Sequence, residues 1–320
     1  MERRSDILTQ ITSNTFLTDG GLETTLIFHQ GIELTYFASF SLLNDEAGKK
    51  ALADYFRPYL NIAQKYQTGF ILDSATWRAN PDWAEKMGYS TEALEQINKI
   101  AIDEVAKLRD EYARPGFPIL LNGCIGPRGD GYVPSNQMTA QEAETYHSEQ
   151  IKTFSQTQAD MVSGLTMNYV EEAIGITLAA KQYGMPVVIS FTVETNGILP
   201  SGQSLQDAII QTDQATDRYV AYYMINCAHP THFMKELQTE GNWLNRIKGI
   251  RANASTKSHK ELDESTELDS GDKQLLARNY QQLKTLIPNL TIIGGCCGTD
   301  HTHLETICEH LFNKKLNSVR

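Results

Sequence analysis

Cysteine is scarce in this chain, with five among 320 residues. A low and odd count argues against a disulfide scaffold and favours a reducing compartment. No apolar run approaches the roughly 18 residues needed to span a bilayer. The first residues, MERRSDILTQITSN, carry charges but lack the apolar core of a secretory signal. These absences predict a cytoplasmic protein with no membrane partner.

Basic side chains are also few, because 28 Lys and Arg face 39 Asp and Glu and the formal net charge is −11. Nucleic acids bind surfaces on which Lys and Arg cluster. The charge therefore predicts no nucleic-acid partner. The composition is 41% hydrophobic, enough to bury a large core. A chain of this length suits either two domains or one α/β barrel.

Short apolar or β-branched runs recur along the chain, and most are continuous, as expected for parallel strands covered on both faces. The predicted strands are 16–20, 69–74, 118–123, 160–165, 186–191, 221–226, 247–253 and 290–295. Helical patterns between them include 90–112, 139–159, 170–183 and 270–287, and the polar stretch 256–272 is predicted to be a loop. Eight such units favour a single (β/α)8 TIM barrel domain over residues 1–320, although a doubly wound sheet would alternate in the same way.

In a TIM barrel the chemistry gathers where the strands end. Three of the five cysteines fall at such positions. Cys227 follows the sixth predicted strand, and the adjacent Cys296 and Cys297 follow the eighth. Barrel closure brings these two strand ends near each other. Glycines on both sides of the pair permit close approach and a positive φ.

Buried packing, a strained vicinal disulfide and metal binding all remain open for the adjacent cysteines. A reducing compartment disfavours the disulfide. Three converging thiolates suit Zn²⁺, and three protein ligands leave a fourth position open. Such a site is better suited to holding an added thiol as a nucleophilic thiolate than to activating water. The other cysteines, Cys124 and Cys308, are predicted to be buried apolar groups.

The sequence resembles the zinc-dependent homocysteine S-methyltransferase family. An Asn-Cys pair upstream of a Cys-Cys pair is specific, whereas a lone Cys-Cys would be weak. The matching motifs are TDGGLETTL (18–26), INCAHP (225–230) and GGCCGTD (294–300). The resemblance covers nearly the whole chain, from about Phe16 to His310. It implies a (β/α)8 barrel.

The resemblance also implies an enzyme whose Zn²⁺ is held by Cys227, Cys296 and Cys297. Such an enzyme moves a methyl group from a small-molecule donor to a thiol acceptor, with homocysteine giving methionine. Donors of the S-methylmethionine, S-adenosylmethionine or betaine type are expected, because the folate enzymes carry further modules. No catalytic residue beyond the zinc site is expected. The residues expected to bind substrate are Asp19, Gly20, Thr166, Asn226 and Asn253.

One departure from the family concerns the fourth strand. Family members typically carry there a Glu that helps to hold the amino group of homocysteine, and Leu165 occupies that position here. Loss of a charge-assisted hydrogen bond costs about 1.5–3 kcal/mol. The sequence therefore predicts that homocysteine is a poor acceptor, unless Asp19, Asp73 or Glu194 supplies the missing carboxylate.

Two other functional classes stay open at this point. A non-catalytic barrel could bind zinc or sense oxidation through its thiols. A zinc hydrolase is disfavoured by the all-sulfur ligand set and by the lack of an evident His or Glu base. The sequence indicates neither the methyl donor nor the oligomeric state.

Overall fold

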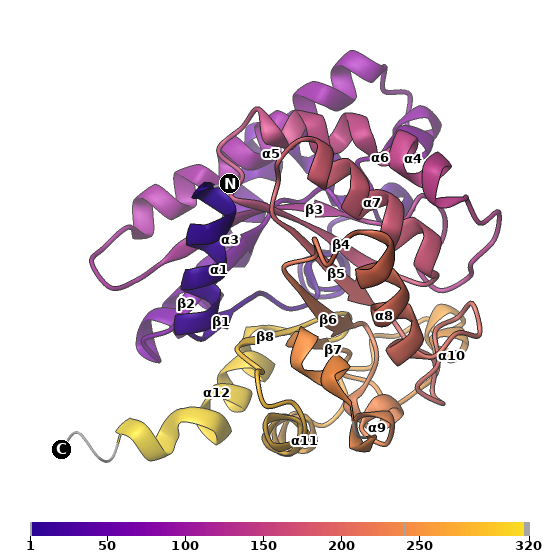
Figure 1. The fold of residues 1–320 in the computed structure, drawn as a ribbon. Helices are drawn as coiled ribbons and strands as arrows, with labels where there is room; N and C mark the ends of the chain where they lie inside the picture. Colours follow the sequence, from indigo (N-terminus) through magenta and orange to yellow (C-terminus); the bar gives the residue numbers. More distant parts are fainter. Residues whose placement is uncertain (1, 240, 317–320) are drawn as a thin grey trace.

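A computed structural model of the protein describes residues 2–239 and 241–316. Its parallel strands close into a barrel in sequence order, with the last strand paired to the first (Figure 1). The strands are β1 (Phe16–Leu17), β2 (Gly69–Asp73), β3 (Ile119–Ile125), β4 (Met161–Met167), β5 (Val187–Phe191), β6 (Tyr222–Asn226), β7 (Ile247–Ala252) and β8 (Ile292–Gly295). The predicted (β/α)8 TIM barrel is confirmed.

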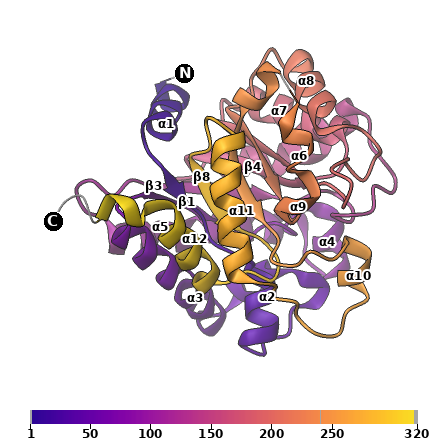
Figure 2. The same cartoon turned by 90° about the horizontal axis from the view of Figure 1, so that it is seen from below.

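Helices surround the barrel, and Figure 2 shows α11 and α12 side by side on its outside. The longer helices are α1 (Glu2–Ser13), α3 (Glu46–Lys65), α5 (Thr91–Tyr112), α6 (Ala140–Ser155), α7 (Val170–Gln182), α8 (Leu205–Ala215), α11 (Lys273–Leu286) and α12 (His301–Leu316). Shorter helices lie in the loops: α2 (Leu22–Thr24), α4 (Pro81–Lys86), α9 (Pro230–Phe233) and α10 (His259–Asp263). These short helices lie in loops that follow strands, and α2, α4 and α10 contribute residues to the site described below.

Most predicted elements agree with the structure to within a few residues, with two informative differences. The first strand was predicted to reach Gly20 but ends at Leu17, because the chain turns there into α2. The stretch 256–272 was predicted to be a loop, and this is wrong for α10. Ser258 and Glu261 form a capping box at the start of that helix.

Two apolar layers explain why the strands read as continuous hydrophobic runs. Successive strand residues point to opposite faces, so Ile71 belongs to the cluster inside the barrel and Leu72 to the layer under the helices. The helix α1, which directly precedes β1, adds Ile7 and Ile11 to the inner cluster. The amino-terminal end of the barrel is therefore filled with side chains.

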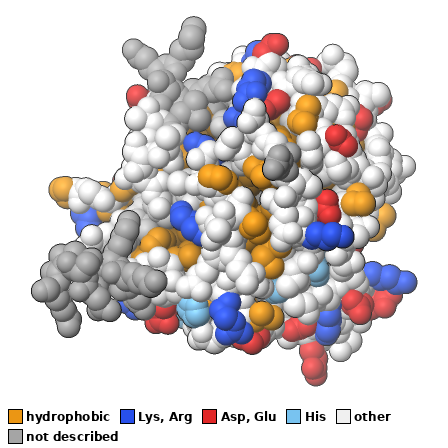
Figure 3. Space-filling view, turned by 60° about the horizontal axis from the view of Figure 1, so that its bottom comes forward, with side chains coloured by type: hydrophobic (Ala, Val, Ile, Leu, Met, Phe, Trp, Pro, Cys, Tyr) orange, Lys and Arg blue, Asp and Glu red, His pale blue; other side chains and the backbone are white. Residues whose placement is uncertain are grey.

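None of the described helices is long and apolar enough to cross a membrane. On the face shown in Figure 3, Lys and Arg side chains are scattered among Asp and Glu. Four large apolar side chains are exposed among the described residues: Phe28, Tyr36, Val133 and Ile210. Phe28 and Tyr36 line the cavity at the carboxyl ends of the strands.

Gly175 on α7 allows close packing against α6, and this packing can be tested. A Cβ at this position would lie 2.4 Å from Ala143 Cβ and 2.5 Å from the Glu144 backbone nitrogen. Gly175→Ala should destabilise the protein by about 1–3 kcal/mol, because forced overlap outweighs the helix preference of Ala. Urea denaturation measures the change. The control Gly129→Ala, where the nearest atom would be 3.9 Å away, should have little effect; equal stability of the two variants would contradict this packing.

Candidate active site

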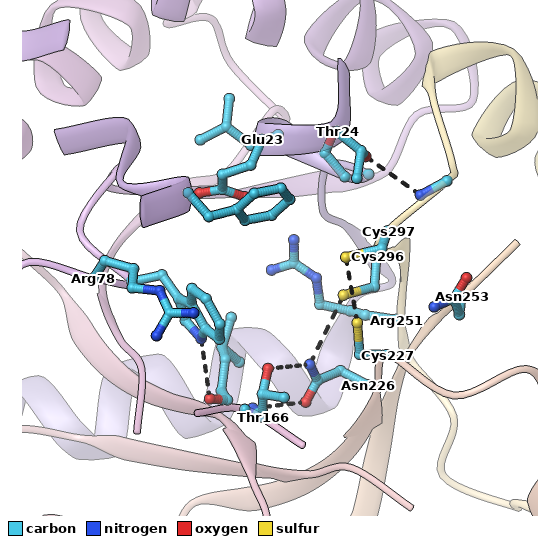
Figure 4. Close-up of a pocket in the computed structure, with 18 of the residues that line it drawn as sticks. Glu23, Thr24, Arg78, Thr166, Asn226, Cys227, Arg251, Asn253, Cys296 and Cys297 are labelled. Carbon is cyan, nitrogen blue, oxygen red and sulfur yellow. Dashed lines mark hydrogen bonds between the residues drawn. The ribbon is translucent and has the colours of Figure 1, made fainter. Parts of the chain in front are cut away.

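A cavity of about 510 Å³ lies at the carboxyl ends of the strands (Figure 4). In TIM barrels this is the end at which chemistry takes place. The structure brings all eight predicted site residues to its wall: Asp19, Gly20, Thr166, Asn226, Cys227, Asn253, Cys296 and Cys297. Barrel closure accounts for this convergence, since these residues end β1, β4, β6, β7 and β8 or directly follow them.

The three cysteines form one cluster. The Sγ atoms of Cys227, Cys296 and Cys297 all lie within 4.8 Å of one another, and the Sγ atoms of Cys227 and Cys297 are 3.5 Å apart. All five cysteines are free, so the structure contains no vicinal disulfide. Cys124 and Cys308 are buried outside the cluster, at 5% and 0% exposure, as predicted for apolar packing.

The backbone around Cys227 holds its side chain in place. Its φ of +57° is an unusual conformation that costs about 1–3 kcal/mol. The Cys227 N–H donates to the Arg251 carbonyl at 3.0 Å, and the Cys227 carbonyl accepts from His259 Nε2 at 2.8 Å. On the other side of the cluster, a Cβ on Gly21 would lie 2.8 Å from the Cys296 carbonyl oxygen. The turn after β1 therefore packs directly on the cysteine pair.

Asn226 connects three strand ends beneath the cluster (Figure 4). Its Nδ2 donates to Thr166 Oγ1 at 2.8 Å, and its Oδ1 accepts from the Thr166 N–H at 3.0 Å and from Ser190 Oγ at 2.6 Å. Its Nδ2 also lies 3.9 Å from Cys296 Sγ. Thr166 has a φ of +64°, which is rare for a β-branched residue. The bonds to Asn226 hold this strained position.

Tyr132 also contacts the cluster, and sequence reasoning missed it. Its hydroxyl lies 2.9 Å from Cys227 Sγ and 3.9 Å from Cys297 Sγ. Its ring stacks on His259 with the ring centroids 4.0 Å apart. Tyr132 comes from the loop between β3 and α6, where nothing in the local sequence points toward the cysteines.

The three thiols differ in how readily each loses its proton. Hydrogen bonds with Cys296 and Cys297 hold the pKa of Cys227 well below its usual value, and the hydrogen bond with Cys227 raises the pKa of Cys296 to about 12. The thiols alone therefore favour a single thiolate, because neighbouring negative charges repel. A divalent cation would draw off further protons. The sulfur atoms of these three cysteines are close enough together to hold one metal ion, and three sulfur ligands suit Zn²⁺.

A buried ion triad lies beside the cysteines. Arg251 Nη2 donates to Asp19 Oδ1 at 2.5 Å, Arg251 Nη1 pairs with Asp73, and Arg251 Nε donates to the Gly295 carbonyl at 3.2 Å. Burial raises the pKa of Asp19 to about 7 against the lowering effect of Arg251. Sequence reasoning missed Arg251, although a charged residue inside the apolar run IKGIRAN was a visible signal.

The carboxylates named as replacements for the fourth-strand Glu all have partners within the protein. Asp19 and Asp73 pair with Arg251, and Glu194 lies 3.3 Å from His259 Nδ1. Leu165 lines the cavity with 7% exposure. A carboxylate that binds an amino group of a substrate must therefore be sought among the other residues of the cavity.

The comparison with protein families decides the class of enzyme. The family model for homocysteine S-methyltransferase matches residues 16–311. The chain belongs to this family. The methyltransferase is 23% identical over 272 residues to homocysteine S-methyltransferase 2 of Arabidopsis thaliana. The aligned region covers 77% of this chain and 79% of the plant protein. The predicted family and the predicted enzyme class, a homocysteine-type S-methyltransferase, are confirmed.

Solved structures show the same fold. The metallated form of the homocysteine methyltransferase MmuM from Escherichia coli superimposes with a TM-score of 0.72 at 18% identity, covering 92% of this chain and 96% of MmuM. The oxidized form of MmuM gives a TM-score of 0.73 at 17% identity, covering 92% and 94%. The barrel of the methyltransferase is thus shared with MmuM over almost its whole length.

The buried triad predicts an unusual sensitivity at Arg251. Arg251→Met should destabilise the protein by about 3–5 kcal/mol, because it leaves two carboxylates buried without their cation. The control is Arg57→Met, since Arg57 and its partner Glu111 are 37% and 48% exposed and such surface pairs contribute less than about 1 kcal/mol. Urea denaturation compares the two variants. Adding Asp19→Asn and Asp73→Asn to Arg251→Met should restore part of the loss; a loss as small as that of Arg57→Met would refute the role of the triad.

Proposed function

We propose that this methyltransferase is zinc-dependent and moves a methyl group from a cationic small-molecule donor to a thiol acceptor. Donors of the S-methylmethionine, S-adenosylmethionine or betaine type fit this chemistry, and homocysteine as acceptor would give methionine. The observation that carries the proposal is the group of three cysteine sulfurs within 4.8 Å of one another on the wall of a cavity at the catalytic end of the barrel.

Cys227, Cys296 and Cys297 would hold the Zn²⁺. When bound, zinc supplies the positive charge that favours the thiolate form of a thiol at neutral pH. Residues around the three cysteines hold these side chains in position. Asn226 bonds the neighbouring strand ends, and the Tyr132 hydroxyl lies against Cys227 Sγ. Contacts of this kind orient ligands and tune their basicity.

The transfer is a displacement at the methyl carbon. A bond forms between the thiolate sulfur and that carbon, while the bond to the sulfur or nitrogen of the donor breaks and its electron pair stays with the donor. The sulfonium sulfur or quaternary nitrogen of the donor becomes neutral, and no oxidant is consumed. Holding both substrates in line removes an entropic cost worth several kcal/mol. Phe28 and Tyr36 on the cavity wall would attract a cationic donor through their ring faces.

The substrate-binding roles of the five predicted residues are part of the proposal. Asp19 and Gly20 bring the turn after β1 to the cavity wall, and Asn253 brings the end of β7. Thr166 and Asn226 bond each other beside Cys296, so they shape the wall next to the acceptor sulfur. We further propose that residues 1–320 act as one domain in the cytoplasm, where reducing conditions keep thiols available.

The first test measures metal content. The purified, reduced protein should contain about one zinc per chain. Cys227→Ser, Cys296→Ser and Cys297→Ser should each lose most of it, whereas the control Cys308→Ser should retain it because Cys308 is buried away from the cluster. Elemental analysis by mass spectrometry gives the stoichiometry. Full zinc content in Cys227→Ser would rule out the three-cysteine site.

The second test measures the reaction. Thiol acceptors are combined with sulfonium and quaternary ammonium donors, and methylated products are detected by mass spectrometry. The zinc protein should methylate at least one thiol, and Cys296→Ser should reduce this to background while Cys308→Ser remains active. A folded, zinc-containing protein that methylates none of the thiols, and whose zinc coordination does not change when thiols are added, would favour the alternative of a non-catalytic zinc-binding or redox-sensing barrel.

A further inference from the structure

Glu23 differs from the two triad carboxylates, Asp19 and Asp73, that line the same cavity. It follows β1 on the short helix α2, and it accepts a hydrogen bond from Ser39 Oγ at 2.8 Å. Among the side chains that the structure describes, no Lys, Arg or His forms an ion pair with its carboxylate. Asp19 and Asp73, by contrast, pair with Arg251. A half-buried carboxylate with one neutral donor lacks the cation that would stabilise it.

Arg78 is the corresponding cation on the same cavity. Its guanidinium carbon lies 4.6 Å from the ring centroid of Trp77 and 3.9 Å from that of Trp83. Its Nη1 donates to the Gly129 carbonyl at 3.2 Å, while its buried Nε has no hydrogen-bond partner. No carboxylate of the described chain lies within ion-pair distance of it. The stacked guanidinium is held flat and keeps donors available for an anion.

The two side chains face the same open space (Figure 4). Glu23 comes from one side and Arg78 from another, with the cysteine cluster beside them. They do not form an ion pair with each other. Burial raises the pKa of Glu23 and lowers that of Arg78, so neither charge is fully compensated by the protein. Thr24, next to Glu23, accepts from the Gly298 N–H at 3.3 Å, and this contact fixes α2 against the turn after β8 that carries the cysteine pair.

We infer that Glu23 binds the ammonium group and Arg78 the carboxylate group of an α-amino acid acceptor whose thiol points to the cysteine cluster. The inference rests on the proposed function and specifies its acceptor. An α-amino acid carries both charges on one carbon, so one ligand compensates both side chains at once. The carboxylate that β4 lacks at Leu165 is supplied from α2 instead. The sequence predicts homocysteine to be a poor acceptor unless one of three other carboxylates replaces the missing Glu. With Glu23 in that role, we expect homocysteine to be a good acceptor.

Three thiols of similar length separate the two contacts. Homocysteine carries both charges, 4-mercaptobutanoate lacks the ammonium, and 3-mercaptopropylamine lacks the carboxylate. Each charge-assisted hydrogen bond that is lost should lower kcat/KM about 10- to 100-fold. Glu23→Gln should therefore impair the use of homocysteine and 3-mercaptopropylamine but spare 4-mercaptobutanoate. Arg78→Met should impair homocysteine and 4-mercaptobutanoate but spare 3-mercaptopropylamine.

Matched variants and a binding measurement complete the test. Asp263→Asn changes an exposed carboxylate on the same cavity and should leave all three thiols unaffected. Leu165→Glu added to Glu23→Gln should restore part of the enzyme's preference for thiols that carry an ammonium group. Zinc content and the circular dichroism spectrum of every variant should match the wild type. Calorimetric titration of homocysteine into each zinc protein should show the same order of affinities as kcat/KM.

The outcomes distinguish this inference from the proposed function. If the wild type methylates homocysteine but Glu23→Gln and Arg78→Met affect all three thiols equally, the assignment of the two charges is wrong and the methyltransferase proposal stands. The same conclusion follows if the variants raise KM for the donor alone. If the zinc-containing wild type neither binds nor methylates any of the thiols, the proposed function fails and the inference fails with it.

Discussion

The ion triad of Arg251 with Asp19 and Asp73 organises the catalytic end of the barrel. Arg251 stands on β7, between the strands that carry the cysteines, and reaches the ends of β1 and β2. Its Nε bonds the Gly295 carbonyl just before the cysteine pair, and its carbonyl accepts from Cys227 N–H. One side chain and its backbone therefore set where both halves of the sulfur cluster lie. Breaking a buried pair is strongly destabilising, so this arrangement resists change.

The cavity is rich in groups that are or can become anionic, and this shapes what it binds. The three clustered thiols, the two triad carboxylates and Glu23 are among the groups that line this space, while Arg251 neutralises only part of that charge. The chemistry proposed for the site involves cations at each stage: a metal ion, a donor with a cationic centre, and an acceptor with an ammonium group. Arg78 stands apart from this set, where a carboxylate at the far end of the acceptor would meet it.

The sequence allowed the barrel and the meeting of the three cysteines to be predicted because both follow from strand order. Once eight parallel strands close, the ends of β6 and β8 must be near each other. The partners of those residues were not predictable in this way. Arg251 meets Asp73 across 178 positions and Asp19 across 232, and such pairs leave no local pattern. Glu23 was part of a recognised motif, but its isolation from cations exists only in three dimensions. The helix α10 was not predicted, although its capping residues Ser258 and Glu261 are visible in the sequence.

The filled amino-terminal end of the barrel has a kinetic consequence. Because α1 packs Ile7 and Ile11 into the inner cluster, the described chain leaves the cavity open toward the other end, and both substrates share that entrance. In the proposed reaction, an acceptor that binds beside the sulfurs would have to enter before the donor fills the space between them and that entrance. Both products then leave by the route through which the donor came. For the proposed reaction, one shared entrance implies a sequential order of addition with the acceptor first, and excess donor would then inhibit by blocking access to the sulfurs.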